Sequence, residues 1–348
     1  MLSVDIKKNL GGFRLDVKFD TDREVMGLLG ASGSGKSMTL KCIAGIERPD
    51  EGLIVLDGKV LFDSEKKINL KPQQRRIGYL FQQYALFPNM TVKQNIAAGC
   101  REKEKLTRQA AIEDKIRSMR LRGLEDKRPH QLSGGQQQRA ALARILINQP
   151  EVLLLDEPFT ALDSYLKWQL EFEVADMLKD FGRDALLVTH SRDEVYRLCD
   201  SVCILQEGKS ESKQATGVFF ETPGTLAACL LSGCKNFSRI RTAGDGGVDA
   251  VDWGVRLKTL GAPPEDAAYA GIRAHYITVS GAPPGENSFP CTVERVVEDV
   301  FSTVVMLSPG DDCTLLRAEG EKDYLGALQP GQKVYACLPA ENLMLVRE

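Results

Sequence analysis

Residues 27–46, GLLGASGSGKSMTLKCIAGI, constrain the fold more than any other stretch of the chain. A glycine-rich turn lies there between an apolar run typical of a buried strand and an apolar run with helical spacing. Its centre, residues 30–37, matches the G-x-x-x-x-G-K-S pattern of a phosphate-binding loop. Glycines let successive backbone N–H groups turn toward an anion, and the following helix adds the positive end of its dipole. The stretch predicts a strand–loop–helix unit that binds a nucleoside triphosphate.

Each residue of this loop is a candidate contact to phosphate or metal. Lys36 is long enough to reach the β- and γ-phosphates, and the Ser37 hydroxyl is a suitable Mg²⁺ ligand. A plain glycine turn is the competing interpretation, and the strand before the loop and the helix after it disfavour that interpretation. The residues expected to bind the nucleotide are Gly30, Ala31, Ser32, Gly33, Ser34, Gly35, Lys36 and Ser37.

The chain length and the order of its patterns predict two domains. At 348 residues the chain exceeds one average domain. Over residues 1–232, strand-like runs alternate with helical patterns, as in an α/β domain with a mainly parallel sheet. We expect an antiparallel β subdomain around the Asp57-Gly58 turn and a helical insertion over 100–128. Residues 233–348 are rich in glycine, proline and short alternating runs, which predicts an all-β domain, clearest over 285–348.

Composition narrows the function classes. The net charge of -3 gives no overall basic footprint, so nucleic acid is not an expected partner. The sequence has no apolar run of about 18 residues and no secretory signal at its start, so we expect neither a membrane span nor export. The 9 cysteines include no C-x-x-C pair, and we expect reduced thiols that pack as small apolar side chains.

Two further segments carry groups suited to nucleotide chemistry. VLLLDEP, residues 152–158, has the pattern of a buried strand that ends in two carboxylates. Asp156 would join the Mg²⁺ shell and Glu157 would act on the water that attacks the γ-phosphate, unless the pair is only a solvated turn. LSGGQQQRAALARIL, residues 132–146, places Ser133 and two glycines before an apolar-periodic helix. This segment predicts either a simple helix cap or a second anion site.

Taken in order, these motifs resemble those of the ATP-binding cassette (ABC) family of transporter ATPases. The resemblance spans nearly all of the first 232 residues. It is carried by GASGSGKS, YLFQQ with Gln82, LSGGQ, LLLDEP, TALD at 160–163 and VTHS with His190. It implies an ATPase that works as a head-to-tail homodimer. In such a dimer, ATP on the phosphate loop of one copy is covered by the LSGGQ segment of the other copy.

The resemblance also implies roles for single residues. Glu157 becomes the catalytic carboxylate, Gln82 senses Mg²⁺ and the attacking water, and His190 contacts the γ-phosphate. Asp163 is expected at the dimer seam. Phe13 is the available aromatic for stacking on adenine, with the core of the small β region as its alternative place. The residues expected to contact the partner's nucleotide are Ser133, Gly134, Gly135 and Gln136. The expected Mg²⁺ ligands are Ser37, Gln82 and Asp156.

Two classes of function compete: a transport ATPase that drives a separate permease, and a non-transport cassette protein that acts on ribosomes or DNA. The sequence shows neither the tandem cassettes nor the long coiled coil typical of the second class. Residues 82–96, QQYALFPNMTVKQNI, resemble the importer segment that meets a permease coupling helix. This implies that Tyr84, Leu86, Phe87 and Met90 face the permease unless they belong to the core. We therefore expect a peripheral protein on the cytoplasmic face of the membrane. Its expected partners are two transmembrane permease subunits, which an extracytoplasmic substrate-binding protein supplies.

The C-terminal tail, residues 233–348, indicates which substrate is transported. Residues 233–240 and 271–279 are similar to the MOP/TOBE-type, OB-like tails of molybdate, tungstate and sulfate importer ATPases, which implies an oxyanion cargo with molybdate first. ATPases of sugar, iron and polyamine importers are the alternative. Molybdate-binding tails carry an Arg-Asn pair, whereas this sequence has Glu286-Asn287. Because an acid repels a dianion, we expect this tail to regulate or to dimerise rather than to sense the oxyanion.

Overall fold

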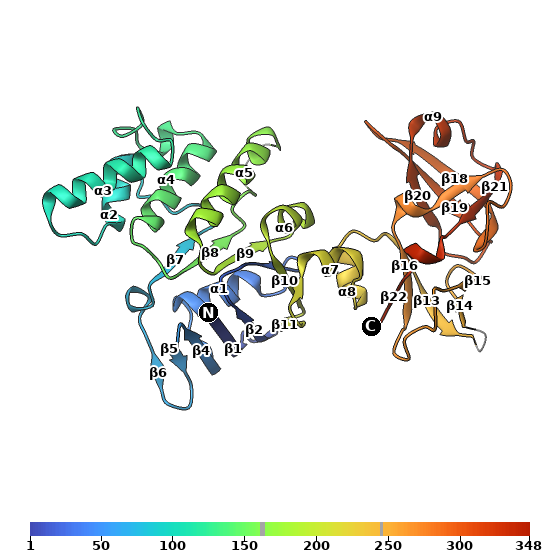
Figure 1. Ribbon diagram of the computed structural model, residues 1–348, viewed down its shortest axis with the longest axis horizontal. Coiled ribbons are helices and arrows are strands. Elements are labelled where there is room, and N and C mark those ends of the chain that lie inside the picture. Colours follow the sequence, from blue (N-terminus) through green and yellow to red (C-terminus); the bar gives the residue numbers. More distant parts are fainter. Residues whose placement is uncertain (161–163, 244–245) are drawn as a thin grey trace. The chain divides into compact units, whose positions relative to one another are not determined.

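The computed structural model describes residues 1–160, 164–243 and 246–348. These residues form two compact units, Met1–Thr216 and Gly217–Glu348 (Figure 1). The shift in composition predicts a boundary after residue 232, whereas the second unit begins earlier, at Gly217. The reason is that helix α8 (Leu226–Leu231) pairs with the end of the chain, where the Leu226 N–H donates to the Arg347 carbonyl over 2.9 Å.

Half of the sheet in the first unit is parallel and buried. Its strands are β3 (Val25–Leu29), β7 (Ile77–Leu80), β8 (Val152–Asp156), β9 (Ala185–Thr189) and β10 (Ser201–Gln206). They lie in the order β10-β3-β9-β8-β7, and neighbours run parallel. All residues of β8 and β9 are buried, as is usual for parallel strands covered on both faces. The carboxyl ends of these strands therefore meet at one edge of the sheet, where ligands bind in such folds.

The other half of this sheet is antiparallel. It contains β1 (Leu2–Asn9), β2 (Arg14–Thr21), β4 (Glu51–Leu56), β5 (Lys59–Asp63) and β6 (Ile68–Asn69). The turn between β4 and β5 is the expected Asp57-Gly58 pair, with φ of 47° and 76°. Short β11 (Lys209–Ser210) joins β2 to β10, and β12 (Gln214–Ala215) pairs with β10.

The helices of the first unit divide into those beside the parallel sheet and those grouped beyond β7 (Figure 1). The first group is α1 (Lys36–Ala44), α5 (Ser164–Phe181) and α6 (Arg192–Leu198). The second group is α2 (Val92–Gly99), α3 (Lys105–Ser118) and α4 (Gly134–Leu146), which share their own apolar cluster. Helix α3 lies in the stretch expected as a helical insertion. No helix among the described residues combines the length and apolarity of a transmembrane span.

The second unit is built from two antiparallel sheets of five strands each. One has the order β15-β14-β13-β16-β22 and the other the order β17-β21-β18-β19-β20. A single apolar cluster, with Trp253 fully buried in it, takes side chains from both sheets. The strands are β13 (Asn236–Thr242), β14 (Gly247–Ala250), β15 (Val255–Lys258), β16 (Tyr269–Ile272), β17 (Thr278–Ser280), β18 (Ser288–Glu298), β19 (Thr303–Ser308), β20 (Leu316–Gly320), β21 (Lys333–Cys337) and β22 (Met344–Val346). Besides α8, its short helices are α7 (Thr216–Glu221) and α9 (Lys322–Leu325).

The fold class expected from the sequence is confirmed. The first unit has the α/β fold with a phosphate loop after β3, and its sheet is mixed because the β subdomain continues the parallel strands. The second unit is dominated by β-structure, as the alternating runs of the tail predict.

Candidate nucleotide-binding site

The phosphate loop lies between β3 and α1, so the expected strand–loop–helix unit is present. Two of its glycines adopt backbone conformations that other residues rarely reach, with φ of 80° at Gly33 and 104° at Gly35. Gly30 is required for a different reason, because a Cβ atom there would lie 2.2 Å from the Leu205 carbonyl oxygen. Gly35 is also the residue that immediately precedes α1, so the positive end of that helix faces the loop.

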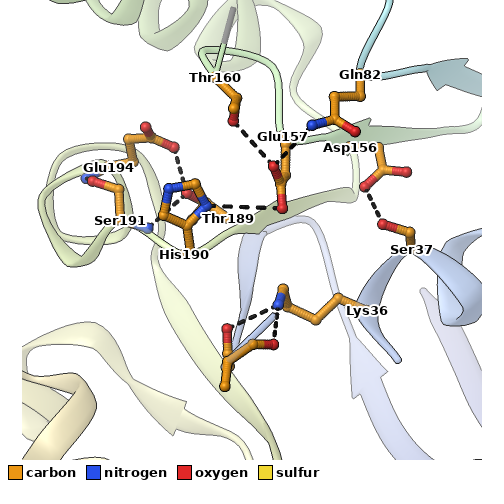
Figure 2. A network of polar contacts seen from close by, with 12 residues as sticks. Lys36, Ser37, Gln82, Asp156, Glu157, Thr160, Thr189, His190, Ser191 and Glu194 are labelled. Atoms are coloured by element: carbon orange, nitrogen blue, oxygen red, sulfur yellow. Dashed lines mark hydrogen bonds and ion pairs between the residues drawn. The ribbon is translucent and has the colours of Figure 1, made fainter. Parts of the chain in front are cut away.

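Lys36 folds back over the loop that precedes it (Figure 2). Its Nζ donates to the carbonyl oxygens of Gly30 and Ala31, each over 2.8 Å. Burial lowers the pKa of Lys36, while the charges of Glu157 and Asp156 oppose that shift. Nζ also donates to the Ser34 hydroxyl at 3.5 Å. A buried ammonium whose hydrogen-bond acceptors are uncharged carbonyl and hydroxyl oxygens is well placed to exchange them for phosphate oxygens.

Asp156, the last residue of β8, is buried and accepts two hydrogen bonds. Its Oδ1 accepts from the Ser37 hydroxyl at 2.7 Å, and its Oδ2 accepts from the Tyr79 hydroxyl at 2.8 Å. Burial, followed by the Asp156 charge, raises the pKa of Tyr79, so this phenol stays protonated. The side chains of Ser37 and Asp156 therefore touch, as a shared metal site requires.

Glu157 lies at the centre of the second polar group. Its Oε2 accepts from Gln82 Nε2 at 3.2 Å and from the Thr160 hydroxyl at 3.1 Å. Its Oε1 lies 3.8 Å from His190 Nδ1. The structure thus brings together three residues that the sequence places far apart: Gln82 after β7, Glu157 after β8 and His190 after β9 (Figure 2). Glu157 has a positive φ of 46°, a sparsely populated conformation for a side chain of this kind.

His190 is exposed, but the turn that carries it is firmly held. The Thr189 hydroxyl donates to Glu194 Oε2 at 2.6 Å and accepts from the Ser191 N–H at 2.9 Å. Glu194 is itself buried and forms an ion pair with Lys167 of α5 at 2.5 Å. The backbone before and after His190 is fixed by these contacts, and its ring is exposed to solvent beside Glu157.

Phe13 lies beside the phosphate loop. Atoms of its ring are 3.3 Å from the place where a Cβ on Gly35 would be. The ring is half-buried and packs against the main apolar core of the first unit. The position suits a base bound next to the loop, and the core contact expected as the alternative is also present.

The LSGGQ segment forms the start of α4. The Ser133 hydroxyl accepts from the Gln136 N–H at 3.4 Å, and the Gln136 side chain accepts from the Ser133 N–H at 3.0 Å, which is a complete capping box. Gly135 packs closely on α5, because a Cβ there would lie 2.8 Å from the Leu170 Cδ1 atom. In the described part of the first unit, no hydrogen bond joins residues 133–136 to the phosphate loop. Asp163, expected at the dimer seam, lies outside the described residues.

The four side chains expected to face a permease differ in their exposure to solvent. Tyr84 is buried and its hydroxyl donates to the Pro158 carbonyl, while Leu86 packs against the α2–α4 cluster. Phe87 and Met90 are exposed, and the Arg144 guanidinium lies over the Phe87 ring at 5.0 Å. Of the four expected side chains, Phe87 and Met90 are exposed, Leu86 is partly buried and Tyr84 is buried.

The donor atoms near Asp156 fit a hard cation. They are a carboxylate, the Ser37 hydroxyl and the Gln82 amide, all of which offer oxygen, the donor that Mg²⁺ prefers. Among the described residues, no cluster of three or more His, Cys, Asp or Glu side chains forms a metal cage. One carboxylate plus a hydroxyl is the usual protein share of a Mg²⁺ site that nucleotide phosphates complete.

The polar groups at the start of β18 in the tail are already paired. Glu286 forms an ion pair with Lys258. Asn287 Oδ1 accepts from the Lys258 N–H at 2.7 Å, and its Nδ2 donates to the carbonyls of Lys258 and Leu338 at 2.9 and 3.1 Å. The side-chain amide of Asn287 is therefore already engaged within the tail.

Sequence reasoning missed Tyr79, Thr160 and Glu194. Tyr79 precedes Phe81 in the run RIGYLF, and alternation along that strand is the only signal that its side chain shares a face with the site. Thr160 belongs to the TALD motif but carries no chemical signature of its own. Glu194 follows His190 by one helical turn, and nothing in the sequence distinguishes it from a solvated acid.

Comparisons with known proteins agree with this geometry. The profile of a family described as ABC transporter matches residues 15–160. The molybdenum import ATP-binding protein ModC of Paramagnetospirillum magneticum is 33% identical, over 98% of this chain and 97% of that protein. The spermidine/putrescine import ATP-binding protein PotA of Nitratidesulfovibrio vulgaris is 34% identical, over 89% and 86%. The Fe(3+) ions import ATP-binding protein FbpC of Haemophilus influenzae is 42% identical, over 63% and 62%.

A solved structure gives the same result for the fold. The dimeric ATP-binding cassette MJ0796, in a post-hydrolysis state bound to ADP and Pi, is 27% identical with a TM-score of 0.53. The match covers 62% of this chain and 99% of that one. Together with the full-length match to an import ATP-binding protein, these findings lead to one conclusion: the chain belongs to the ABC transporter family, as an ATPase subunit of the import type.

Proposed function

We propose that this subunit binds Mg²⁺-ATP at residues 30–37 and hydrolyses it as one half of a homodimer. The observation that carries the proposal is the position of Glu157. Its carboxylate is held by Gln82, Thr160 and His190 at the strand edge that also carries the phosphate loop and Asp156. This is where a group that orients or deprotonates the attacking water is needed.

Each residue then has a defined task. The loop N–H groups and Lys36 bind the β- and γ-phosphates, while Phe13 offers a face to the base. Ser37, Asp156 and Gln82 hold Mg²⁺, which when bound neutralises charge on those phosphates. Glu157 accepts the proton of the attacking water. His190, exposed beside Glu157, donates a hydrogen bond to the γ-phosphate.

A second copy completes the site. The first turn of α4 has backbone N–H groups that point out of the helix, and residues 133–136 make no hydrogen bond to their own phosphate loop among the described residues. Helix starts of this kind bind phosphate. We propose that Ser133, Gly134, Gly135 and Gln136 contact the nucleotide of the partner copy. The similarity to a dimeric cassette bound to ADP and Pi supports this arrangement.

Hydrolysis is tested with a loop variant and a matched control. Lys36→Ala removes the cation that faces the phosphates, so we expect ATP turnover to fall by at least about 100-fold. Lys18→Ala removes an exposed lysine that pairs with Asp5 on the β1–β2 face, and turnover should stay at the level of the unaltered protein. Release of phosphate from ATP measures both. Equal turnover in Lys36→Ala and the unaltered protein would remove the catalytic proposal.

We propose an oxyanion as the cargo, with molybdate first and tungstate or sulfate next. The match to the molybdenum import protein supports molybdate because it includes the tail as well as the cassette. Polyamine is the second candidate, since a spermidine/putrescine import protein also matches over most of both chains. The paired state of Glu286 and Asn287 supports a tail that regulates or dimerises and does not bind the oxyanion.

The remaining partners follow from this proposal. The subunit would lie on the cytoplasmic face of the membrane, with Phe87 and Met90 against one of two transmembrane permease subunits. An extracytoplasmic binding protein would deliver the cargo. Reconstitution with the permease and that binding protein tests the cargo: molybdate should stimulate ATP turnover and spermidine should not. Stimulation by spermidine alone would replace the oxyanion with the second candidate.

Titration of the purified subunit with molybdate, tungstate and sulfate tests the tail. We expect no heat of binding in a calorimeter, because the side-chain amide of Asn287 is already engaged inside the tail. Saturable binding of any of the three anions would assign a sensing role to the tail.

A further inference from the structure

The Tyr79 hydroxyl touches the carboxylate that the proposed site assigns to the metal. It donates to Asp156 Oδ2 at 2.8 Å, on the side away from the Ser37 hydroxyl, which donates to Oδ1 at 2.7 Å. The two oxygens of Asp156 therefore have different partners. Ser37 belongs to the phosphate loop, whereas Tyr79 belongs to the neighbouring strand β7. The orientation of this carboxylate is fixed from both sides.

The register of the sheet explains why Tyr79 reaches this position. Tyr79 is paired with Leu154 on β8, and side chains on a strand alternate between faces. Leu154 and Asp156 thus lie on the same face, and the length of a tyrosine spans the step between them. The ring itself is held by the main apolar core and by the Phe81 ring, whose centroid is 4.3 Å away.

A donor in this position does what the outer shell of a metal site does. Ligands to metals are commonly oriented by a hydrogen bond from a group that does not touch the metal. A phenol at neutral pH keeps its proton, so it donates to Oδ2 and leaves Oδ1 as the oxygen beside Ser37.

We propose that Tyr79 is a positioning residue for Mg²⁺: it holds Asp156 so that the oxygen beside Ser37 faces the metal. This inference rests on the Mg²⁺-ATP site of the proposed function. A ring that only filled space in the core would not need the hydroxyl, and Tyr79→Phe separates the two roles because it keeps the ring and removes the donor.

The test uses the full-length protein and a metal readout that does not depend on turnover. Free Mn²⁺ is titrated by electron paramagnetic resonance in the presence of a non-hydrolysable ATP analogue. In Tyr79→Phe we expect the Kd for Mn²⁺ to rise by about 10-fold. The affinity for the analogue in EDTA and the midpoint of thermal unfolding should stay close to those of the unaltered protein.

Tyr324→Phe is the control, because it removes a phenol hydrogen bond of the same length, 2.8 Å to the Val279 carbonyl, in the second unit. Its Kd for Mn²⁺ should not change. An unchanged Kd in Tyr79→Phe would overturn the inference, and so would an equal loss of affinity with and without metal, since that marks a structural role. If the unaltered protein binds no Mn²⁺-nucleotide complex and Lys36→Ala does not change nucleotide binding, the proposed site is wrong. The inference about Tyr79 is then wrong as well.

Discussion

At the scale of single residues, Glu157 is the proposed catalytic carboxylate, so it should determine whether bound ATP is hydrolysed. Glu157→Gln keeps the shape of the side chain and its contact distance to Gln82, but an amide cannot accept the proton of water. We expect ATP turnover to fall by about 100- to 10,000-fold. The affinity for ATP should remain, because Lys36 and the loop are untouched. Phosphate release and equilibrium binding of a fluorescent ATP analogue measure the two quantities, and loss of binding together with turnover would contradict the assignment.

The site residues that the sequence singles out are those whose chemistry is unusual, and their roles stay predictions. A lysine and a serine after a glycine loop, or two acids after an apolar strand, carry their function in their type and spacing. Tyr79 and Thr160 could not be found in this way, because tyrosine and threonine occur in many roles. Tyr79 contacts Asp156, which lies 77 residues further along the chain, and Thr160 contacts Glu157, 3 residues before it. The contact of Tyr79 forms only when β7 and β8 pair in the correct register.

At the scale of helices and strands, α5 is joined to α6 by the ion pair of Lys167 with Glu194 and by a second ion pair of Glu171 with Arg197. Glu194 is nearly fully buried, and its partners are Lys167 on α5 and the Thr189 hydroxyl. Lys167→Met leaves a buried carboxylate without its cation. We expect a loss of about 2 to 3 kcal/mol in the free energy of unfolding, somewhat below the range for a wholly buried pair because Lys167 is partly exposed.

A double-mutant cycle tests the pairing. The variant with both Lys167→Met and Glu194→Gln should lose less stability than the sum of the two single variants, because the second change removes the stranded charge. Urea unfolding supplies the four free energies. Additive losses would show that the two side chains do not interact in solution.

The start of α4 gives a second prediction at this scale. Ser133→Ala removes one half of the capping box and should cost about 1 kcal/mol of stability. It should also reduce ATP turnover, since the same helix start is proposed to contact the partner's nucleotide. Thr225→Ala is the matched control, because Thr225 caps α8 in the second unit through the Ala228 N–H. A cap loss there should lower stability and leave turnover unchanged. Equal turnover in Ser133→Ala and Thr225→Ala would show that the start of α4 has no role in ATP turnover beyond stability.

Element positions were also only partly readable from the sequence. The strands β3, β7, β8 and β9 follow from apolar runs that end in polar turns. The start of the second unit at Gly217 does not, because α8 pairs with residues at the far end of the chain. Composition records where the glycines and prolines lie and carries no signal of that pairing.

At the scale of the whole molecule, two copies of the chain are proposed to form each complete site. In this proposal, residues 30–37 would bind ATP, and residues 133–136 of another copy would cover it. The chain alone supplies both parts, yet within the described residues no hydrogen bond joins them. Family resemblance predicted this division from the order of motifs, and no local pattern could have done so, because it concerns contact between chains.

The most direct test asks whether a nucleotide bound to the phosphate loop of one chain can be cross-linked to residues 133–136 of the other chain. A ¹⁵N-labelled Lys36→Ala chain, whose loop no longer binds ATP, is mixed with an unlabelled Glu157→Gln chain. An ATP analogue with an aryl azide on its γ-phosphate is then activated by light. We expect cross-linked ¹⁵N peptides that contain residues 133–136, because the nucleotide sits on the unlabelled partner. Cross-links found only on peptides of the unlabelled Glu157→Gln chain would contradict this arrangement.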